Sequence, residues 1–191
     1  NSLSFTADGV TVTATAWSYA TTGFEAAQLG QWSPGIGVCN TAEVCGDPVH
    51  QVDNQGRNEY VLFQFSAPVN PLSMFINPYG TYDLDVSYWT GTVTLPSNLL
   101  TGETYGSLAG LGFSPRIDVD GPVSSFIGID VPLTSPYVTA LLFGPKYDGG
   151  GDDYFKIRSL TGSVPEPSAL LLLGLGMIGL IWLQTKRGLP V

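Results

Sequence analysis

The chain has 191 residues, of which 16 are acidic and seven basic, and its formal net charge is −9. Its 24 glycines, 14 prolines and 12% of charged residues suit short strands joined by turns and argue against a helical bundle. Residues 1–163 carry 15 acidic and five basic residues, a charge of about −10 that would repel phosphate backbones. We therefore expect no nucleic-acid partner. Such a surface suits calcium, a basic partner or simple solubility.

The N-terminal segment predicts a β-hairpin. Residues 10–17 alternate between small apolar side chains and Thr or Trp, which is the period of a strand with one face inward. Residues 3–7 show the same alternation. Asp8 and Gly9 between them form a favoured two-residue hairpin turn.

The segment 30–57 is rich in Gly, Pro and Asn and predicts a long loop. It holds both cysteines, Cys39 and Cys45, separated by five residues. Outside the cytoplasm two thiols this close are expected to form a disulfide. A metal site that adds Asp47 and His50 is the alternative, and the cysteine spacing is not that of a zinc knuckle.

The rest of the domain reads as further short strands. The run 60–65 is apolar on both faces, so we expect a central strand there. The segment 82–89 alternates, with Leu84, Val86 and Tyr88 on one face. Turns are predicted at 68–71, 78–80 and 144–153, and further strands at 24–29, 72–76, 124–131, 137–143 and 154–160, while 91–122 is ambiguous. This spacing predicts a mainly β fold, an antiparallel, jelly-roll-like β-sandwich over residues 1–163.

The last 28 residues predict a membrane anchor. Residues 169–185 are uncharged and predominantly apolar, and about 17 to 25 such residues cross a bilayer as a helix. Lys186 and Arg187 follow in the short tail 186–191, which places that end in the cytoplasm. The N-terminal domain then lies on the periplasmic side of a bacterial inner membrane. Since it must cross that membrane, we expect a mature form from which a leader has been removed.

A short motif joins the domain to this helix. Residues 164–168 read Val164, Pro165, Glu166, Pro167 and Ser168. Together with the apolar helix and the basic end, this motif resembles the PEP-CTERM anchor of Gram-negative surface proteins. The resemblance implies recognition by exosortase, a membrane enzyme thought to cut near the motif. The segments 5–17, 52–65 and 152–157 also look like exosortase-dependent surface proteins, a group without an established enzymatic activity.

No catalytic constellation is visible in the sequence, whose single histidine is His50. We therefore expect a non-catalytic protein without a required cofactor. Calcium is the strongest ligand hypothesis, at Asp148, Asp152 and Asp153 on a Gly-rich turn, because calcium takes six to eight oxygen ligands. A second candidate group is Asp53, Asn54 and Glu59. The alternative for both groups is an acidic turn that binds no ion.

Tryptophans on strand faces offer a second binding hypothesis. Trp17, Trp32 and Trp89 would be able to stack on a glycan if their rings were exposed, and Trp32 and Trp89 are our candidates. Packing against neighbouring side chains is the alternative use of these rings.

Three functions follow as expectations. The first is a structural or adhesive protein, membrane-anchored by its helix and sorted to the cell surface or extracellular matrix, where polysaccharide would be its partner. The second is an accessory subunit of a larger membrane complex, held by an uncleaved helix. The third is a glycan-binding module.

Overall fold

The computed structural model describes residues 2–33, 35–45, 50–80, 83–93, 99–122, 127–147, 153–165 and Met177. Twelve strands and one 3-10 helix are found in these residues. They are β1 (Ser2–Ala7), β2 (Val10–Ala20), β3 (Gly23–Ala26), β4 (Gln28–Trp32), β5 (Gly35–Cys39), β6 (Val52–Asp53), β7 (Asn58–Pro78), β8 (Val86–Gly91), η1 (Leu108–Leu111), β9 (Ile117–Val119), β10 (Ile129–Pro132), β11 (Val138–Pro145) and β12 (Tyr154–Ser163).

The predicted hairpin is confirmed. Strands β1 and β2 pair antiparallel from Ser2 opposite Thr15 to Ala7 opposite Val10. Asp8 and Gly9 have φ angles of 49° and 76°, the left-handed values that a tight hairpin turn of this kind requires. The predicted turn at 78–80 is also present, with Gly80 at a φ of 65°.

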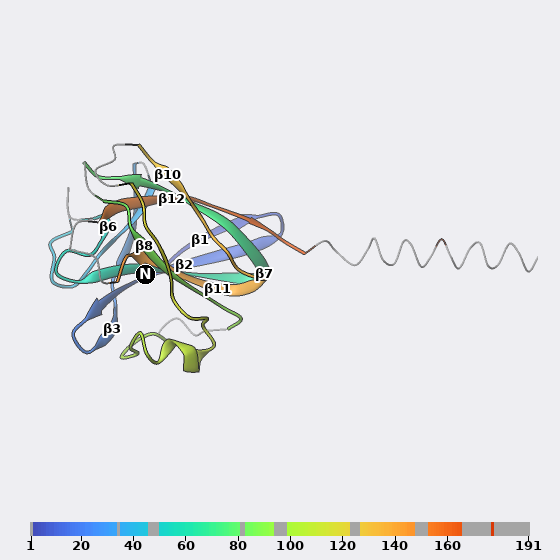
Figure 1. Ribbon diagram of the computed structural model, residues 1–191, viewed down its shortest axis with the longest axis horizontal. Coiled ribbons are helices and arrows are strands. Elements are labelled where there is room, and N and C mark those ends of the chain that lie inside the picture. Colours follow the sequence, from blue (N-terminus) through green and yellow to red (C-terminus); the bar gives the residue numbers. More distant parts are fainter. Residues whose placement is uncertain are drawn as a thin grey trace, which may run out of the picture.

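The strands form two antiparallel layers that share β7. Its first part, residues 58–69, pairs with β2 and β11. Its second part, residues 70–78, pairs with β12 and β10. The first layer continues from β11 to β8 and β9, and the second from β12 to β5 and β4. Figure 1 shows β7 curving from one layer into the other. The mainly β, antiparallel, sandwich-like prediction is confirmed, while the jelly-roll strand order stays a prediction.

Two of the loop expectations are wrong. The turn predicted at 68–71 lies inside β7, which runs through both Pro68 and Pro71. The segment 30–57 is not one loop, because β5 and β6 lie in it and Val38 N donates to Gln51 O at 3.1 Å. Residues 35–39 pair through their backbone with β4 and β12, and this pairing orders the segment. Because the segment is rich in glycine, its side chains show no clear alternation from which a strand is predicted.

The main core lies between the two layers, as expected for a sandwich. Residues Leu84, Val86 and Tyr88 belong to it, which confirms the face predicted for the segment 82–89. Its other large members come from both layers: Phe63, Phe65, Met74, Ile76, Leu141, Phe143, Phe155 and Ile157.

A second core covers the outer face of the first layer. The segment 99–113, which includes η1, packs over this face and joins β3 through two backbone hydrogen bonds, Phe24 N to Glu103 O at 2.7 Å and Gly102 N to Phe24 O at 2.8 Å. Strand β7 is therefore buried on both sides near its start, as its sequence predicts. The buried members of this core are Trp17, Phe24, Tyr60, Leu62, Trp89, Leu100, Leu108, Phe113, Ala140 and Leu142.

No helix among the described residues is long and apolar enough to cross a membrane. The predicted membrane helix at 169–185 lies outside these residues except for Met177, as does the tail 186–191. The membrane helix and the division of the chain at 163, 168 and 185 stay predictions.

Candidate functional site

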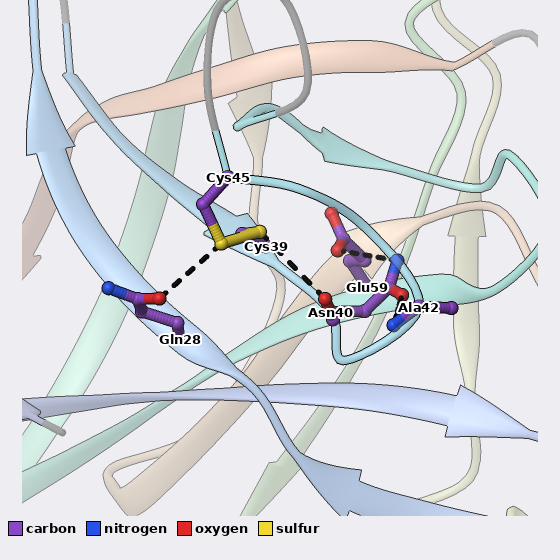
Figure 2. The surroundings of a disulfide bond; sticks show 6 residues. All are labelled: Gln28, Cys39, Asn40, Ala42, Cys45 and Glu59. Atoms are coloured by element: carbon purple, nitrogen blue, oxygen red, sulfur yellow. Dashed lines mark hydrogen bonds between the residues drawn. A yellow bond between two sulfur atoms is a disulfide. The ribbon is translucent and has the colours of Figure 1, made fainter.

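The predicted disulfide is present between Cys39 and Cys45, whose Cα atoms are 5.7 Å apart. Cys39 ends β5 and is buried, whereas Cys45 is exposed and its Sγ lies 3.4 Å from Gln28 Oε1 (Figure 2). The bond closes the loop 40–44 against the edge of the second layer. It also removes both cysteines as ligands for the alternative metal site with Asp47, a residue that lies outside the described part of the chain.

The closed loop covers a buried carboxylate. Asn40 Nδ2 donates to Glu59 Oε1 at 3.1 Å, and Asn40 Oδ1 accepts from Ala42 N at 2.9 Å (Figure 2). Asp53 N donates to Glu59 Oε2 at 3.4 Å, so both oxygens of Glu59 are in contact with a donor. Glu59, in β7, is completely buried, and Asp53, in β6, is 3% exposed.

Burial favours the protonated forms of Glu59 and Asp53. Burial raises the pKa of Glu59 well above its usual range, and the neighbouring Asp53 and Glu43 raise it further. Burial likewise raises the pKa of Asp53 to about 7, although a hydrogen bond from Gln55 N lowers it. Two adjacent buried carboxyls cannot both ionise at little cost. The pair therefore holds at least one proton into the neutral range, but its burial leaves little room for a substrate.

The single histidine lies beside a buried lysine. Lys156 Nζ, on β12, is 2.9 Å from His50 Nε2 and donates to Ser33 O at 3.2 Å. The ring of Trp32 packs on His50, with 4.5 Å between the ring centroids, and lies 5.7 Å from Lys156 Nζ. Lys156 was missed by sequence reasoning. It lies on the face of β12 opposite Phe155 and Ile157, where alternation predicts exposure, and the segment 32–33 and His50 cover it.

The structure describes the second candidate calcium group in full and only Asp153 of the first. Asp148 and Asp152 lie outside the described residues, so that site stays a prediction. Asp153 is 1% exposed and accepts from Asn54 Nδ2 at 2.6 Å and from Asp85 N at 2.9 Å. Asn54 of the second candidate group thus turns to Asp153, away from Glu59. Within the described residues, no three His, Cys, Asp or Glu side chains are arranged to hold a metal ion.

The tryptophan candidates differ in how much of each residue is exposed. Trp89 is 3% exposed and stacks on Tyr105, with 5.6 Å between the ring centroids. Trp17 is 2% exposed and its indole N–H donates to Thr15 Oγ1 at 3.0 Å. At Trp89 the alternative use, packing against neighbouring side chains, is found, because the segment 99–113 covers that face of the sheet. Trp32 is half-buried and keeps part of its ring accessible.

The described residues form a mainly β, antiparallel domain with a disulfide. The family comparison concerns the residues that follow this domain. Residues 163–187 match the family model of the PEP-CTERM protein-sorting motif. The chain carries this sorting tail, and the predicted resemblance is confirmed. The match begins at Ser163, the last residue of β12, so the tail continues directly from the final strand. Val164 and Pro165 are described, whereas Glu166 and Pro167 are not. No characterised protein and no solved structure is significantly similar to the chain.

Proposed function

We propose that this chain is a non-catalytic structural or adhesive protein that is anchored in the bacterial inner membrane, sorted by an exosortase and displayed at the cell surface or in the extracellular matrix. The observation that carries the proposal is the sorting motif at residues 163–187, which directly follows the last strand. A tail of this kind is an address for export, and the domain before it is the exported part.

The domain has properties that support an extracytoplasmic location. Its disulfide between Cys39 and Cys45 suits an oxidising compartment. Most of its large aromatic side chains among the described residues belong to the two cores or pack against them. Its buried His50 contacts Lys156 and Trp32.

Processing of the tail tests the proposal. The chain would be expressed in a Gram-negative host that has an exosortase, as wild type and as a variant with Pro165, Glu166 and Pro167 replaced by Ala. Intact mass and membrane fractionation are measured. We expect a wild-type mass that ends near Pro167 and release from the membrane, and a full-length, membrane-bound variant. The control is Thr161→Ala, an exposed change just before the motif, which should be processed like wild type.

The accessory-subunit function gives the opposite result. A full-length wild-type mass through Val191, with membrane proteins co-purifying in fixed stoichiometry, would identify a complex subunit and refute the sorted surface protein.

Glycan binding remains the third proposed function, now resting on Trp32 and its partly accessible ring. It predicts saturable binding to a defined polysaccharide that Trp32→Ala abolishes. Tyr137→Ala, which removes a ring that is 45% exposed elsewhere on the domain, is the matched control and should bind normally.

A further inference from the structure

Strand β1 forms an edge of the first layer. Within the described part of the chain it pairs with β2 and with no other strand. All of its residues except Leu3 are exposed. The outer side of β1 is therefore accessible to a further strand.

The register of the hairpin shows which residues of β1 direct their backbone outward. Thr11 lies opposite Thr6 and donates its backbone N–H to Ser66 Oγ of β7 at 2.9 Å, away from β1. The pair of Thr6 and Thr11 is thus a non-hydrogen-bonded pair, and such pairs alternate with hydrogen-bonded ones in an antiparallel ladder. Ser2, Ser4 and Thr6 consequently direct their N–H and C=O groups to the open edge.

This edge lacks the protection that edge strands usually have. Proteins keep such strands short or place charged residues and proline in them. The edge strands β9 and β10 follow this rule, with three and four residues, Asp118 in β9, and Asp130 and Pro132 in β10. Strand β1 has six residues and neither a charge nor a proline, and β4, the edge of the second layer, has none either. An unprotected edge of this length is a template for another strand.

The distribution of charge favours a second copy of the chain as the source of that strand. Residues 1–163 carry a net charge of about −10, so two copies repel each other over most of their surfaces. The segment 2–20 is different, because Asp8 is its one charged residue. An uncharged edge gives no advantage to a basic partner, and it lets a second β1 approach without charge repulsion.

We propose that two copies of this chain pair through β1, antiparallel and about a twofold axis at Ser4. In this register Ser4 lies opposite Ser4 of the second copy, and Ser2 lies opposite Thr6. All three outward residues then meet outward residues and form about six backbone hydrogen bonds, whereas the neighbouring registers form about four. Asp8 of one copy lies about 27 Å from Asp8 of the other, well beyond the roughly 8 Å screening length at physiological ionic strength.

The apolar side chains of β1 suit this pairing. Leu3 and Phe5 lie on the face toward the second layer, and Phe5 is 43% exposed, although large apolar rings are mostly buried. An apolar cavity of about 280 Å³ lies beside Phe5 and is also lined by Ile36 and Ile157. In the proposed register, Leu3 of one copy lies opposite Phe5 of the other on this face, so each exposed ring gains an apolar neighbour.

Antiparallel pairing also fixes the relative direction of the two domains. The tip of the hairpin and the start of the sorting tail lie at the same end of the domain, where Thr11 meets Ser66 and Ser163 pairs with Asn70 (Figure 1). Since the second copy runs in the opposite direction, the two tails leave the dimer at opposite ends. For chains anchored as proposed, the pairing therefore joins released copies or copies on facing membranes. The pairing itself stands without the proposed function, because β1 belongs to the domain.

The mass of the full chain in mild detergent tests the proposal. Size-exclusion chromatography with light scattering measures the protein mass of the particle. We expect twice the mass of one chain at about 100 μM and the mass of one chain at about 1 μM, because a single strand pair is a small interface.

Variants at Ser4 test whether the edge forms the contact. Ser4→Pro removes an outward N–H that β2 does not use, and Ser4→Lys places two like charges opposite each other at the axis. Both should halve the particle mass at about 100 μM. Thr13→Lys is the control, because Thr13 lies opposite Ser4 on β2, one strand in from the edge, and the substitution causes the same change in charge. It should still give the dimer. The Lys variant keeps the backbone N–H, so it tests the pairing independently of any effect of proline on the hairpin.

Single cysteines test the register. Ser4→Cys places two thiols at the axis with a Cα–Cα distance of about 5.5 Å, which suits a disulfide. Thr6→Cys, also exposed on β1, places its two thiols about 14 Å apart along the strands. Under mild oxidation Ser4→Cys should cross-link at least tenfold faster than Thr6→Cys.

Three outcomes would overturn the proposal. They are a wild-type chain that stays monomeric at about 1 mM, a dimer that both Ser4→Pro and Ser4→Lys leave intact, and equal rates of cross-linking at the two cysteine positions. Slow amide hydrogen exchange of Ser4 and Thr6 in a monomeric chain would show that another segment of the same chain covers the edge, and this too refutes it. None of these results affects the proposed function, since tail processing is read from the intact mass of the covalent chain.

Discussion

The buried carboxyl of Asp53 predicts that this domain loses stability as the pH rises. Burial raises the pKa of Asp53 from its ordinary value of 3.8 to about 7. An acid with a raised pKa in the folded state holds its proton more tightly when folded than when unfolded. Between pH 4 and 7 the folded chain therefore binds more protons, and the free energy of unfolding falls as pH rises.

The size of this effect follows from the shift. One pKa unit corresponds to about 1.36 kcal/mol, so the change from 3.8 to about 7 amounts to roughly 4 kcal/mol above pH 7. Asp53→Asn removes the charge and keeps an oxygen that accepts from Gln55 N, a bond of 2.9 Å in the wild type. We expect the variant to be more stable than wild type at pH 8 by up to about 4 kcal/mol, and nearly equal at pH 4.

Denaturant unfolding followed by tryptophan fluorescence, from pH 4 to pH 8, measures the difference. Asp8→Asn, the same chemical change in the exposed hairpin turn, is the control and should show no comparable gain at pH 8. Part of the pH dependence should survive in Asp53→Asn, because Glu59 also has a raised pKa. A variant that is less stable than wild type at pH 8, or a difference that does not change with pH, would refute the reasoning.

Three further predictions concern stability. Reduction of the Cys39–Cys45 disulfide should lower the free energy of unfolding by about 2 kcal/mol, because the unfolded chain regains the entropy that the closed loop removed. We expect a fall in Tm of about 4–8 °C with a reducing agent, and an unchanged Tm would contradict this. Leu108→Ala should cost about 2–5 kcal/mol in denaturant unfolding, because η1 closes the second core, whereas Val44→Ala, at a site 88% exposed, should stay within about 0.5 kcal/mol. Gly23→Ala should cost at least about 1 kcal/mol, since its φ is 144° and a Cβ would lie 2.7 Å from Glu103 O; thermal unfolding at the wild-type Tm would disprove the clash.

Features set by neighbours in the chain were predictable. The hairpin follows from alternation and from Asp8 and Gly9, which need no distant contact to adopt positive φ angles. The disulfide follows from two cysteines close in sequence. The sorting tail is a contiguous motif, so it is read without any knowledge of the fold.

Features set by distant contacts were not predictable. Pro68 and Pro71 predict a turn, yet β7 continues through both residues. In this region β7 ends its pairing with β2 and β11 and begins its pairing with β12, and the register of β12 on β7 shifts opposite Pro71. Whether Trp89 is exposed or packed stayed open in the sequence, because alternation cannot show that the segment 99–113 covers its face.

The sequence by itself therefore determined the strand periodicity, the hairpin, the disulfide and the sorting motif. Only the tertiary structure decided which faces are buried, that Lys156 meets His50 and that Asp53 meets Glu59. The physical reason is that alternation and turn geometry are local, whereas burial depends on segments that pack together from far apart in the chain.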